Sequence, residues 1–241
     1  MIDAFSGLAE CDFNLSPSSI KKSRRTRSAT RSLFDYFNLD VLSNLPMTGK
    51  GQMPVMNPVN PNIKLPNEMV AFDKAFTENR TDCITHFYTD DRRFLRVIRN
   101  PKKYLPFLKS CAAVVEPDLS QYINMPYPLR QAHAWLNRAV AAWWQSQGVT
   151  VIQNITWSLK DSYGYSLEGR ASNTIVAVNC TGIVGHDISK HLWKQGYENV
   201  VLALHPTLIL RYGDRMPGER TEISAYFDNP NFNILRNGSK W

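Results

Sequence analysis

The chain has 241 residues, of which 43% are hydrophobic, and this is enough to bury one substantial core. No apolar run approaches the roughly 20 residues that cross a bilayer, and the N-terminus lacks the basic and apolar stretches of a secretory signal. The sequence therefore predicts a cytoplasmic protein with no membrane partner. The net charge of +7 is typical of proteins that bind nucleic acid, but it is concentrated in one segment.

That segment is residues 21–31, which read KKSRRTRSATR and contain six basic side chains and no acidic one. Subtracting these six from +7 leaves +1 for the rest of the chain. Blocks of Lys and Arg often contact phosphates, so nucleic acid is a predicted partner of this basic arm. The alternatives are a solvated segment, or one that pairs with acidic surface of the same protein. The predicted nucleic-acid-binding residues are Lys21, Lys22, Arg24, Arg25, Arg27 and Arg31.

Residues 1–65 are predicted to form an irregular N-terminal extension that includes this arm. Within it, residues 32–42 have apolar side chains close to helical spacing. Prolines at positions 54, 58, 61 and 66 follow. Because proline fixes φ and disfavours helix at the residue before it, this part indicates an extended connector on the body of the protein or a linker.

From residue 83 onward the pattern becomes regular, with short apolar runs separated mostly by segments of helical spacing. Strands buried on both faces have this character and belong to parallel sheets covered by helices. The sequence predicts an α/β fold with a largely parallel sheet of about five βα units, either doubly wound or TIM-like (half-barrel). The five predicted strands lie within residues 84–89, 112–115, 149–157, 174–179 and 207–212. The predicted helices lie at 94–108, broken at Asn100-Pro101, and at 129–143 and 188–196.

The predicted core domain spans residues 66–215, and residues 216–241 are predicted to be a C-terminal extension. This last part is polar and rich in Asn, with one strand expected at residues 223–227.

Ligands of such folds bind beyond the carboxyl ends of the strands, because the loops converge there. Three of the five predicted strand ends carry carboxylates. They are Asp90 and Asp91, Glu116 and Asp118, and Asp214. The sequence predicts a carboxylate-lined site at this edge.

Asp90, Asp91 and Asp118 are the candidate catalytic residues, because paired carboxyl groups can divide into a general acid and a general base. Oxygen ligands also suit Mg²⁺, so Asp90 and Asp118 are candidate metal ligands and Mg²⁺ is a candidate cofactor. The structural alternative is that Asp90 or Asp91 caps the next helix and that Asp118 occupies a turn.

Five further residues are candidates for ligand binding. Asn154 and Trp157 follow the third strand, and Asn179 and Thr181 follow the fourth, where a glycine turn leads into a helix and could present backbone N–H groups to a phosphate. A tight turn that simply needs glycine is the alternative. Arg130, in the first turn of the predicted long helix, could reach an anionic ligand.

Several motifs follow one another in an order that resembles a known family. They are HFYTDD at 86–91, NPKKY at 100–104, EPDLS at 116–120, VIQNITW at 151–157, VAVN at 176–179 and RYG at 211–213. Together they resemble a phage- and mobile-element-associated bacterial family catalogued only as a domain of unknown function, over roughly residues 65–215. The resemblance implies a mobile-element setting and brings no established activity.

The leading hypothesis is a cytoplasmic, mobile-element-associated protein that acts on or near nucleic acid, with its site at the strand ends. Whether it is an enzyme is left open; metal-dependent phosphodiester or nucleotide chemistry is the enzymatic version. One alternative is a non-enzymatic binder of a host protein or a small nucleotide. Another is a metabolite- or carbohydrate-directed barrel enzyme that uses an Asp pair.

Overall fold

The computed structural model describes residue 42, residues 44–183 and residues 185–229. Its centre is a seven-stranded sheet in which every neighbouring pair of strands is parallel. The strands are β3 (Met69–Ala71), β4 (Ile84–His86), β5 (Ala113–Val115), β6 (Val151–Asn154), β7 (Ile175–Asn179), β8 (Leu208–Tyr212) and β9 (Ser224–Phe227). The prediction of an α/β fold with a largely parallel sheet is confirmed, and each of the five predicted runs contains a strand.

The order of strands in the sheet is the order in the chain, from β3 to β9. A doubly wound sheet instead reverses direction at a switch point. The sheet is also strongly curved. The rings of His86 on β4 and Tyr212 on β8 have centroids only 4.3 Å apart, although three strands lie between β4 and β8 in the sheet. Of the two predicted arrangements, the structure therefore has the TIM-like, half-barrel one.

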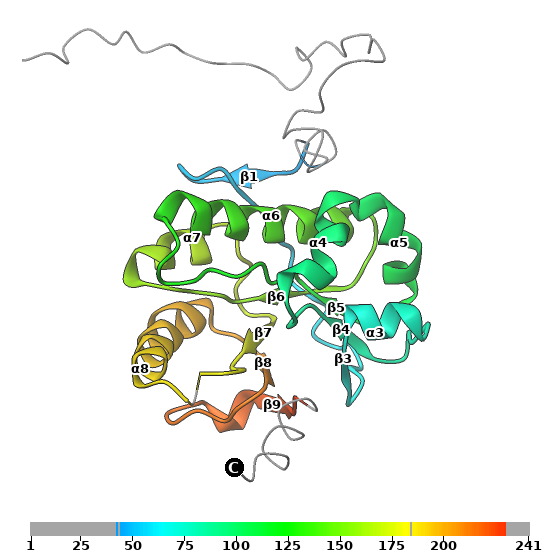
Figure 1. Cartoon of the computed structure of the whole chain (residues 1–241). Coiled ribbons are helices and arrows are strands. Elements are labelled where there is room, and N and C mark those ends of the chain that lie inside the picture. The colour runs from blue at the N-terminus through cyan, green and yellow to red at the C-terminus, as the bar shows by residue number, and fades with distance from the viewer. Residues whose placement is uncertain (1–41, 43, 184, 230–241) are drawn as a thin grey trace, which may run out of the picture.

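The helices run round the outside of the curved sheet (Figure 1). Right-handed crossovers between sequential parallel strands place their helices on one face, which explains this arrangement. The α-helices are α3 (Phe72–Thr77), α4 (Asp91–Arg99), α5 (Pro101–Ser110), α6 (Tyr127–Ser146), α7 (Tyr163–Leu167) and α8 (Asp187–Gly196). A π-helical turn, η3 (Tyr197–Val201), continues α8, and short 3-10 turns lie at η2 (Lys160–Ser162), η4 (Leu202–Leu204) and η5 (Thr221–Ile223).

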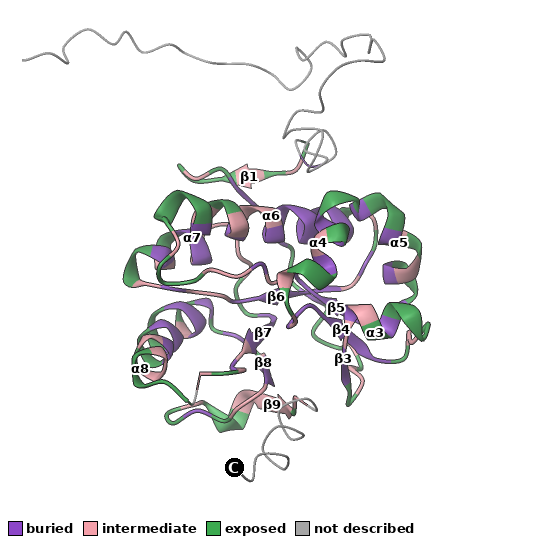
Figure 2. Ribbon diagram, viewed as in Figure 1, coloured by how far each residue is buried: buried purple, intermediate pink, exposed green. Residues whose placement is uncertain are grey.

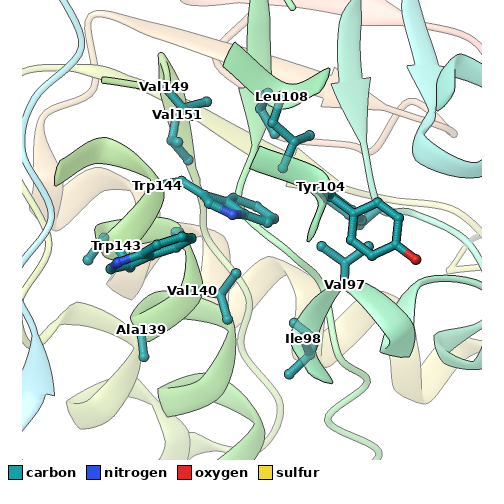
Figure 3. Close-up of a cluster of buried hydrophobic side chains, with 14 of the residues drawn as sticks. Val97, Ile98, Tyr104, Leu108, Ala139, Val140, Trp143, Trp144, Val149 and Val151 are labelled. Atoms are coloured by element: carbon teal, nitrogen blue, oxygen red, sulfur yellow. The ribbon is translucent and has the colours of Figure 1, made fainter. Parts of the chain in front are cut away.

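Successive side chains of a strand point to opposite faces of the sheet, and each face has its own hydrophobic core. Val114 of β5 faces outward into a cluster with α4, α5 and α6, part of which is drawn in Figure 3. Its neighbours Ala113 and Val115 face inward, where they pack with side chains from β4, β6, β7 and β8. Figure 2 shows the central strands as buried, whereas the outer sides of the helices are exposed. A third cluster lies between β7, β8 and α8.

Local signals explain where the helices begin and end. Asn100 ends α4, and its side chain accepts a hydrogen bond from the backbone N–H of Lys103, while Pro101 opens α5. The predicted break at Asn100-Pro101 is therefore a boundary between two helices. Gly148, with φ of +89°, follows α6 at the predicted stop.

The proline-rich segment covers the opposite end of the half-barrel from the strand ends that were predicted to form the site. The backbone N–H of Val59 donates to Thr174 Oγ1, just before β7, and Ile63 and Leu65 pack against the inner core. The prediction of an extended connector on the body fits this segment. A short antiparallel pair precedes it, formed by β1 (Met47–Thr48) and β2 (Met53–Pro54).

The predicted domain limits at 65 and 215 stay predictions, although the sheet itself reaches further, since β9 lies at residues 224–227. The helix expected at 32–42, apart from Leu42, and the basic arm lie outside the described residues.

Within the described part, no helix is both long and apolar enough to traverse a membrane. Cys83, Cys111 and Cys180 are buried there as free thiols.

Candidate functional site

A cavity of about 560 Å³ opens beyond the carboxyl ends of β5, β6 and β7, against α8. This size is typical of small-molecule sites, which range from about 300 to 1,000 Å³. Its polar lining consists of Asp118, Gln121, Asn124, Thr156, Ser158, Asn179, Thr181 and Ser189. Its apolar lining consists of Tyr122, Ile123, Ile155, Trp157, Val178, Ile183, Leu192 and Trp193.

Asp118 is the only carboxylate among the described residues of this lining. Three side chains donate hydrogen bonds to it: Asn154 Nδ2 (2.8 Å) and Thr156 Oγ1 (2.9 Å) to Oδ1, and Asn179 Nδ2 (3.4 Å) to Oδ2. The donors come from the ends of two neighbouring strands, β6 and β7, so parallel pairing brings them to the same place. The structure thus brings three of the predicted site residues, Asp118, Asn154 and Asn179, into one hydrogen-bonded group.

Burial raises the pKa of the Asp118 carboxyl to about 6. The hydrogen bonds from Thr156, Asn154 and Asn179 oppose this rise, because they stabilise the charged form, and the negative charge of Asp91 adds to it. Desolvation is therefore the larger effect. A carboxyl group with this pKa exchanges its proton readily near neutral pH.

Hydrogen bonds with Tyr88 and Glu116 fix the orientation of Asn154. Tyr88 donates its phenolic hydrogen to Asn154 Oδ1 at 3.0 Å, which turns the amide nitrogen toward Asp118. The backbone N–H of Asn154 donates to Glu116 at 3.0 Å. Glu116 and Arg170 form an ion pair in which both side chains are at least 96% buried. This pair joins the end of β5 to the segment before β7, so the site has a rigid support.

Asp90 and Asp91 do not line the cavity. Asp90 is the N-cap of α4, where it accepts from the Arg92 backbone N–H at 3.0 Å, and its side chain, 46% exposed, pairs with the Arg92 guanidinium at 2.8 Å. The pKa of Asp90 is lowered to about 2, chiefly by the hydrogen bond from Arg92. Asp91 accepts from the backbone N–H and the hydroxyl of Ser120, which fastens the loop that carries Asp118.

Within the described part of the chain, no three His, Cys, Asp or Glu side chains are grouped so that they could hold a metal ion. The donors around Asp118 are amide nitrogens and a hydroxyl. The Mg²⁺ site at Asp90 and Asp118 stays a prediction, to which the partners of these two side chains give no support.

Trp157 lies where the sequence predicted a ligand contact, in the wall of the cavity. Its indole N–H donates to the Leu192 carbonyl at 3.2 Å, which ties the ring to α8. Gly196 makes this approach feasible, because a Cβ at that position would lie 1.9 Å from Trp157 Nε1. The ring position therefore depends on a glycine nearly 40 residues away in the chain.

Asn179 and Thr181 form the turn after β7. The backbone N–H of Thr181 donates to Asn179 Oδ1 at 2.9 Å, so Asn179 shapes the turn with its oxygen and faces Asp118 with its nitrogen. Thr181 belongs to the cavity lining, and its buried Oγ1 has no hydrogen-bond partner among the described residues. The hydroxyl of Ser158, a residue 95% buried, is also without one.

Arg130 lies away from the cavity. Its guanidinium forms two hydrogen bonds with Asp161, at 2.8 and 2.9 Å, and a third with the Met125 carbonyl. These bonds use most of its donors, so its predicted role with an anionic ligand stays a prediction. The six basic-arm residues lie outside the described residues.

Sequence reasoning missed Thr156, Ser158 and Tyr88 as parts of the site. Thr156 lies in the predicted third run, and Ser158 directly follows it. Thr156 lies two residues after Asn154, on the same side of an extended chain; that spacing was the available signal. Tyr88 gave no such signal, because its contact with Asn154 crosses from β4 to β6.

A known protein family matches the part of the chain that contains all of the described strands. Residues 46–229 match the family described as "Domain of unknown function (DUF4417)", which is more than half of the chain. The chain belongs to this family. The resemblance to a family catalogued only as a domain of unknown function is thereby confirmed, and the DUF4417 match includes β1 to β9.

Two curated relatives of this DUF4417 chain come from phages. The gene 1 protein of Mycobacterium phage L5 is 30% identical over 128 residues, covering 53% of this chain and 56% of the relative. The gene 1 protein of Mycobacterium phage D29 is 30% identical over 149 residues, covering 59% and 55%. The matched part thus spans about half the length of these relatives. No solved structure matches the chain.

Proposed function

We propose that the chain is an enzyme that moves a proton on a small, uncharged ligand, with Asp118 as the general acid–base group. The observation that carries this proposal is a single carboxyl group with a pKa of about 6 in the wall of a cavity of small-molecule size. General acid–base catalysis is most efficient when the pKa of the catalytic group lies near the working pH.

The surroundings of Asp118 support a catalytic role over a purely structural one. Asn154, Thr156 and Asn179 hold the carboxylate in one orientation while one side of the residue borders the cavity. A carboxylate that served only as a helix cap would instead receive backbone N–H groups, as Asp90 does. Fixed side-chain donors around a reactive group are what a preorganised site requires.

The lining supports an uncharged ligand. Among the residues that the structure describes, it includes no Lys, Arg or His, so a phosphate group inside the cavity would lack a cationic partner there. Arg170 and Arg130 are already paired with Glu116 and Asp161. A single carboxylate beside an anionic ligand would add repulsion.

At pH 7 a group with a pKa near 6 is mostly ionised, so Asp118 is expected to act first as a base. It would accept a proton from an oxygen or nitrogen atom of the ligand and then return it to the product. The predicted pairing of Asp90 with Asp118 is not needed for this step, since Arg92 and α4 already occupy the oxygens of Asp90.

The test compares the wild-type protein with Asp118→Asn and, as a matched control, Asp90→Asn, which retains the ability to cap α4. Each is incubated with a small-molecule extract of bacterial cells, and the compounds consumed or formed are followed by mass spectrometry. We expect a conversion that Asp118→Asn slows by about 10²- to 10⁴-fold and that Asp90→Asn leaves unchanged. Its rate should rise with pH through about 6. Equal conversion by Asp118→Asn would refute the proposal, whereas a bound but unchanged compound would favour the non-enzymatic binder.

Nucleic-acid binding is a second candidate function, favoured by the six basic side chains of residues 21–31. It concerns a different part of the chain and is compatible with a catalytic cavity in the body. Salt-dependent DNA binding tests it independently of Asp118.

A further inference from the structure

We infer that the ligand of this cavity is a nucleobase, either of a free nucleoside or of a single-stranded nucleic acid. The inference rests on the proposed function for its site and adds the chemical class of the ligand. It depends on how polar and apolar groups are divided between the walls of the cavity.

One wall is continuous and apolar. Ile155, Val178 and Trp193 belong to a single packed cluster, and Trp157 and Ile183 pack against it. All five line the cavity. A flat, apolar ring face is the part of a ligand that such a wall can cover without leaving polar atoms unpaired.

Trp157 gives this wall an aromatic surface that is held in place. Its N–H edge is bonded to Leu192, and Gly196 leaves room for the ring beside α8. The remaining ring surface is therefore the part that can line the cavity. Bases stack on aromatic side chains whatever their sequence, because every base has a π-face.

A polar group of the lining lies at the strand ends. Thr156 and Asn179 each donate a hydrogen bond to Asp118 there. Two buried hydroxyl groups nearby, Ser158 Oγ and Thr181 Oγ1, lack partners among the described residues. A buried polar atom without a partner is costly, so rotation of either hydroxyl toward a ligand in the cavity would be favourable.

A nucleobase has this division, with two apolar faces and an edge that carries both donors and acceptors. A hexose also has apolar C–H faces, with its hydroxyl groups around the edge, so hexoses are the competing class and are included as probes in the test. Because the described part of the lining has no Lys or Arg, a phosphate is expected at the mouth, where Tyr122 and Ile123 are 63% and 52% exposed. The base is therefore the part of a nucleotide that fits inside.

The test measures binding of four kinds of probe to the full chain by calorimetry and saturation-transfer NMR: nucleosides, nucleoside 5′-monophosphates, hexoses, and a short single-stranded DNA. We expect a nucleoside to bind, Trp157→Leu to weaken it about tenfold or more, and Ser158→Ala to weaken it severalfold. Trp135→Leu is the matched control, since Trp135 is also partly buried but bonds to Gln52 outside the cavity. It should leave binding unchanged.

The outcomes separate the two proposals. Binding of hexoses without nucleosides, or no binding of any probe, overturns the nucleobase inference. Neither result bears on the acid–base role of Asp118, which the conversion assay tests separately. If neither Trp157→Leu nor Ser158→Ala changes the affinity for nucleosides, the inference is also overturned, because the nucleoside then binds outside this cavity. A nucleoside that is bound and converted equally well by Asp118→Asn supports the ligand class and refutes the acid–base role. Binding of the single strand but not of nucleosides, sensitive to Trp157→Leu, assigns the base to nucleic acid.

Discussion

At the scale of single residues, Asp118 should make the folded state less stable as the pH rises. Its pKa is raised from 3.8 to about 6 in the folded chain. Between these values the folded state keeps a proton that the unfolded state has lost, so raising the pH favours unfolding. The cost at neutral pH is at most about 3 kcal/mol, since each tenfold change in proton affinity is worth about 1.4 kcal/mol.

Asp118→Asn should therefore remove this dependence and make the protein more stable than wild type at pH 7, as measured by urea unfolding at several pH values. Asp90→Asn serves as the control, because the pKa of Asp90 is lowered and its titration falls below this window. If the wild-type and Asp118→Asn proteins lose stability in parallel between pH 4 and 7, the raised pKa is wrong.

The buried His86 should have the opposite effect on the pH dependence of stability: it should make the folded state less stable as the pH falls. Burial between the rings of Tyr88 and Tyr212 lowers its pKa to about 3. Below its unfolded pKa of about 6.5, the unfolded state takes up a proton that the folded state refuses, so stability falls as the pH drops from 6.5 toward 3.

The substitution His86→Asn keeps an acceptor for the Tyr88 backbone N–H, which donates to His86 Nδ1 at 3.1 Å. It should flatten the acid side of the stability profile. In the wild type, the ring signals of His86 should show no titration between pH 8 and 5 in NMR spectra. A titration midpoint near 6.5 for His86 would contradict the prediction.

At the scale of elements, the contact between α8 and Trp157 depends on Gly196. A methyl group there would meet the indole ring at 1.9 Å, and a ring cannot bend aside as a flexible chain can. Gly196→Ala should lower the free energy of unfolding by about 1–3 kcal/mol, the usual cost of overpacking, and should weaken any ligand that contacts Trp157.

Gly164→Ala is the matched control for this substitution. Gly164 is also helical, in α7, and nothing lies within 4 Å of an added Cβ. Alanine is the better helix former, so this variant should be as stable as wild type or slightly more so. Equal stability of both variants would show that Trp157 moves freely, and would remove one support for the nucleobase site.

The elements also show what local sequence could and could not reveal. The longer apolar runs and α6 were predictable, because burial on both faces and helical spacing leave a mark on consecutive residues. β3 (Met69–Ala71) was not among the predicted strands, because it leads directly into α3 at Phe72 and no turn residue separates the two apolar segments. Asp118 was found from its position after β5, whereas the positioning residue Tyr88 depends on a contact between strands.

At the scale of the whole molecule, the choice between a doubly wound sheet and a half-barrel lay beyond the sequence for a related reason. Both folds use the same buried strands and covering helices, so consecutive residues look alike in the two. What distinguishes them is strand order and curvature, such as the approach of His86 to Tyr212 across the interior. That contact joins residues 126 positions apart, and no local pattern encodes it.

Charge is also a property of the whole molecule, and its distribution yields the last prediction. Six of the seven net positive charges belong to residues 21–31, so the remaining chain is nearly neutral. If the arm binds phosphates, the logarithm of the affinity for double-stranded DNA should fall with the logarithm of salt concentration with a slope of about −5, as expected for six contacts. Replacing the six basic residues by serine in the full chain should abolish binding, as measured by fluorescence anisotropy. Reversing the order of the same eleven residues should preserve it, because counterion release depends on charge and not on sequence. Retained affinity after the serine replacement would refute the arm as the binding element, and loss of affinity on reversal would mean that its contacts are specific.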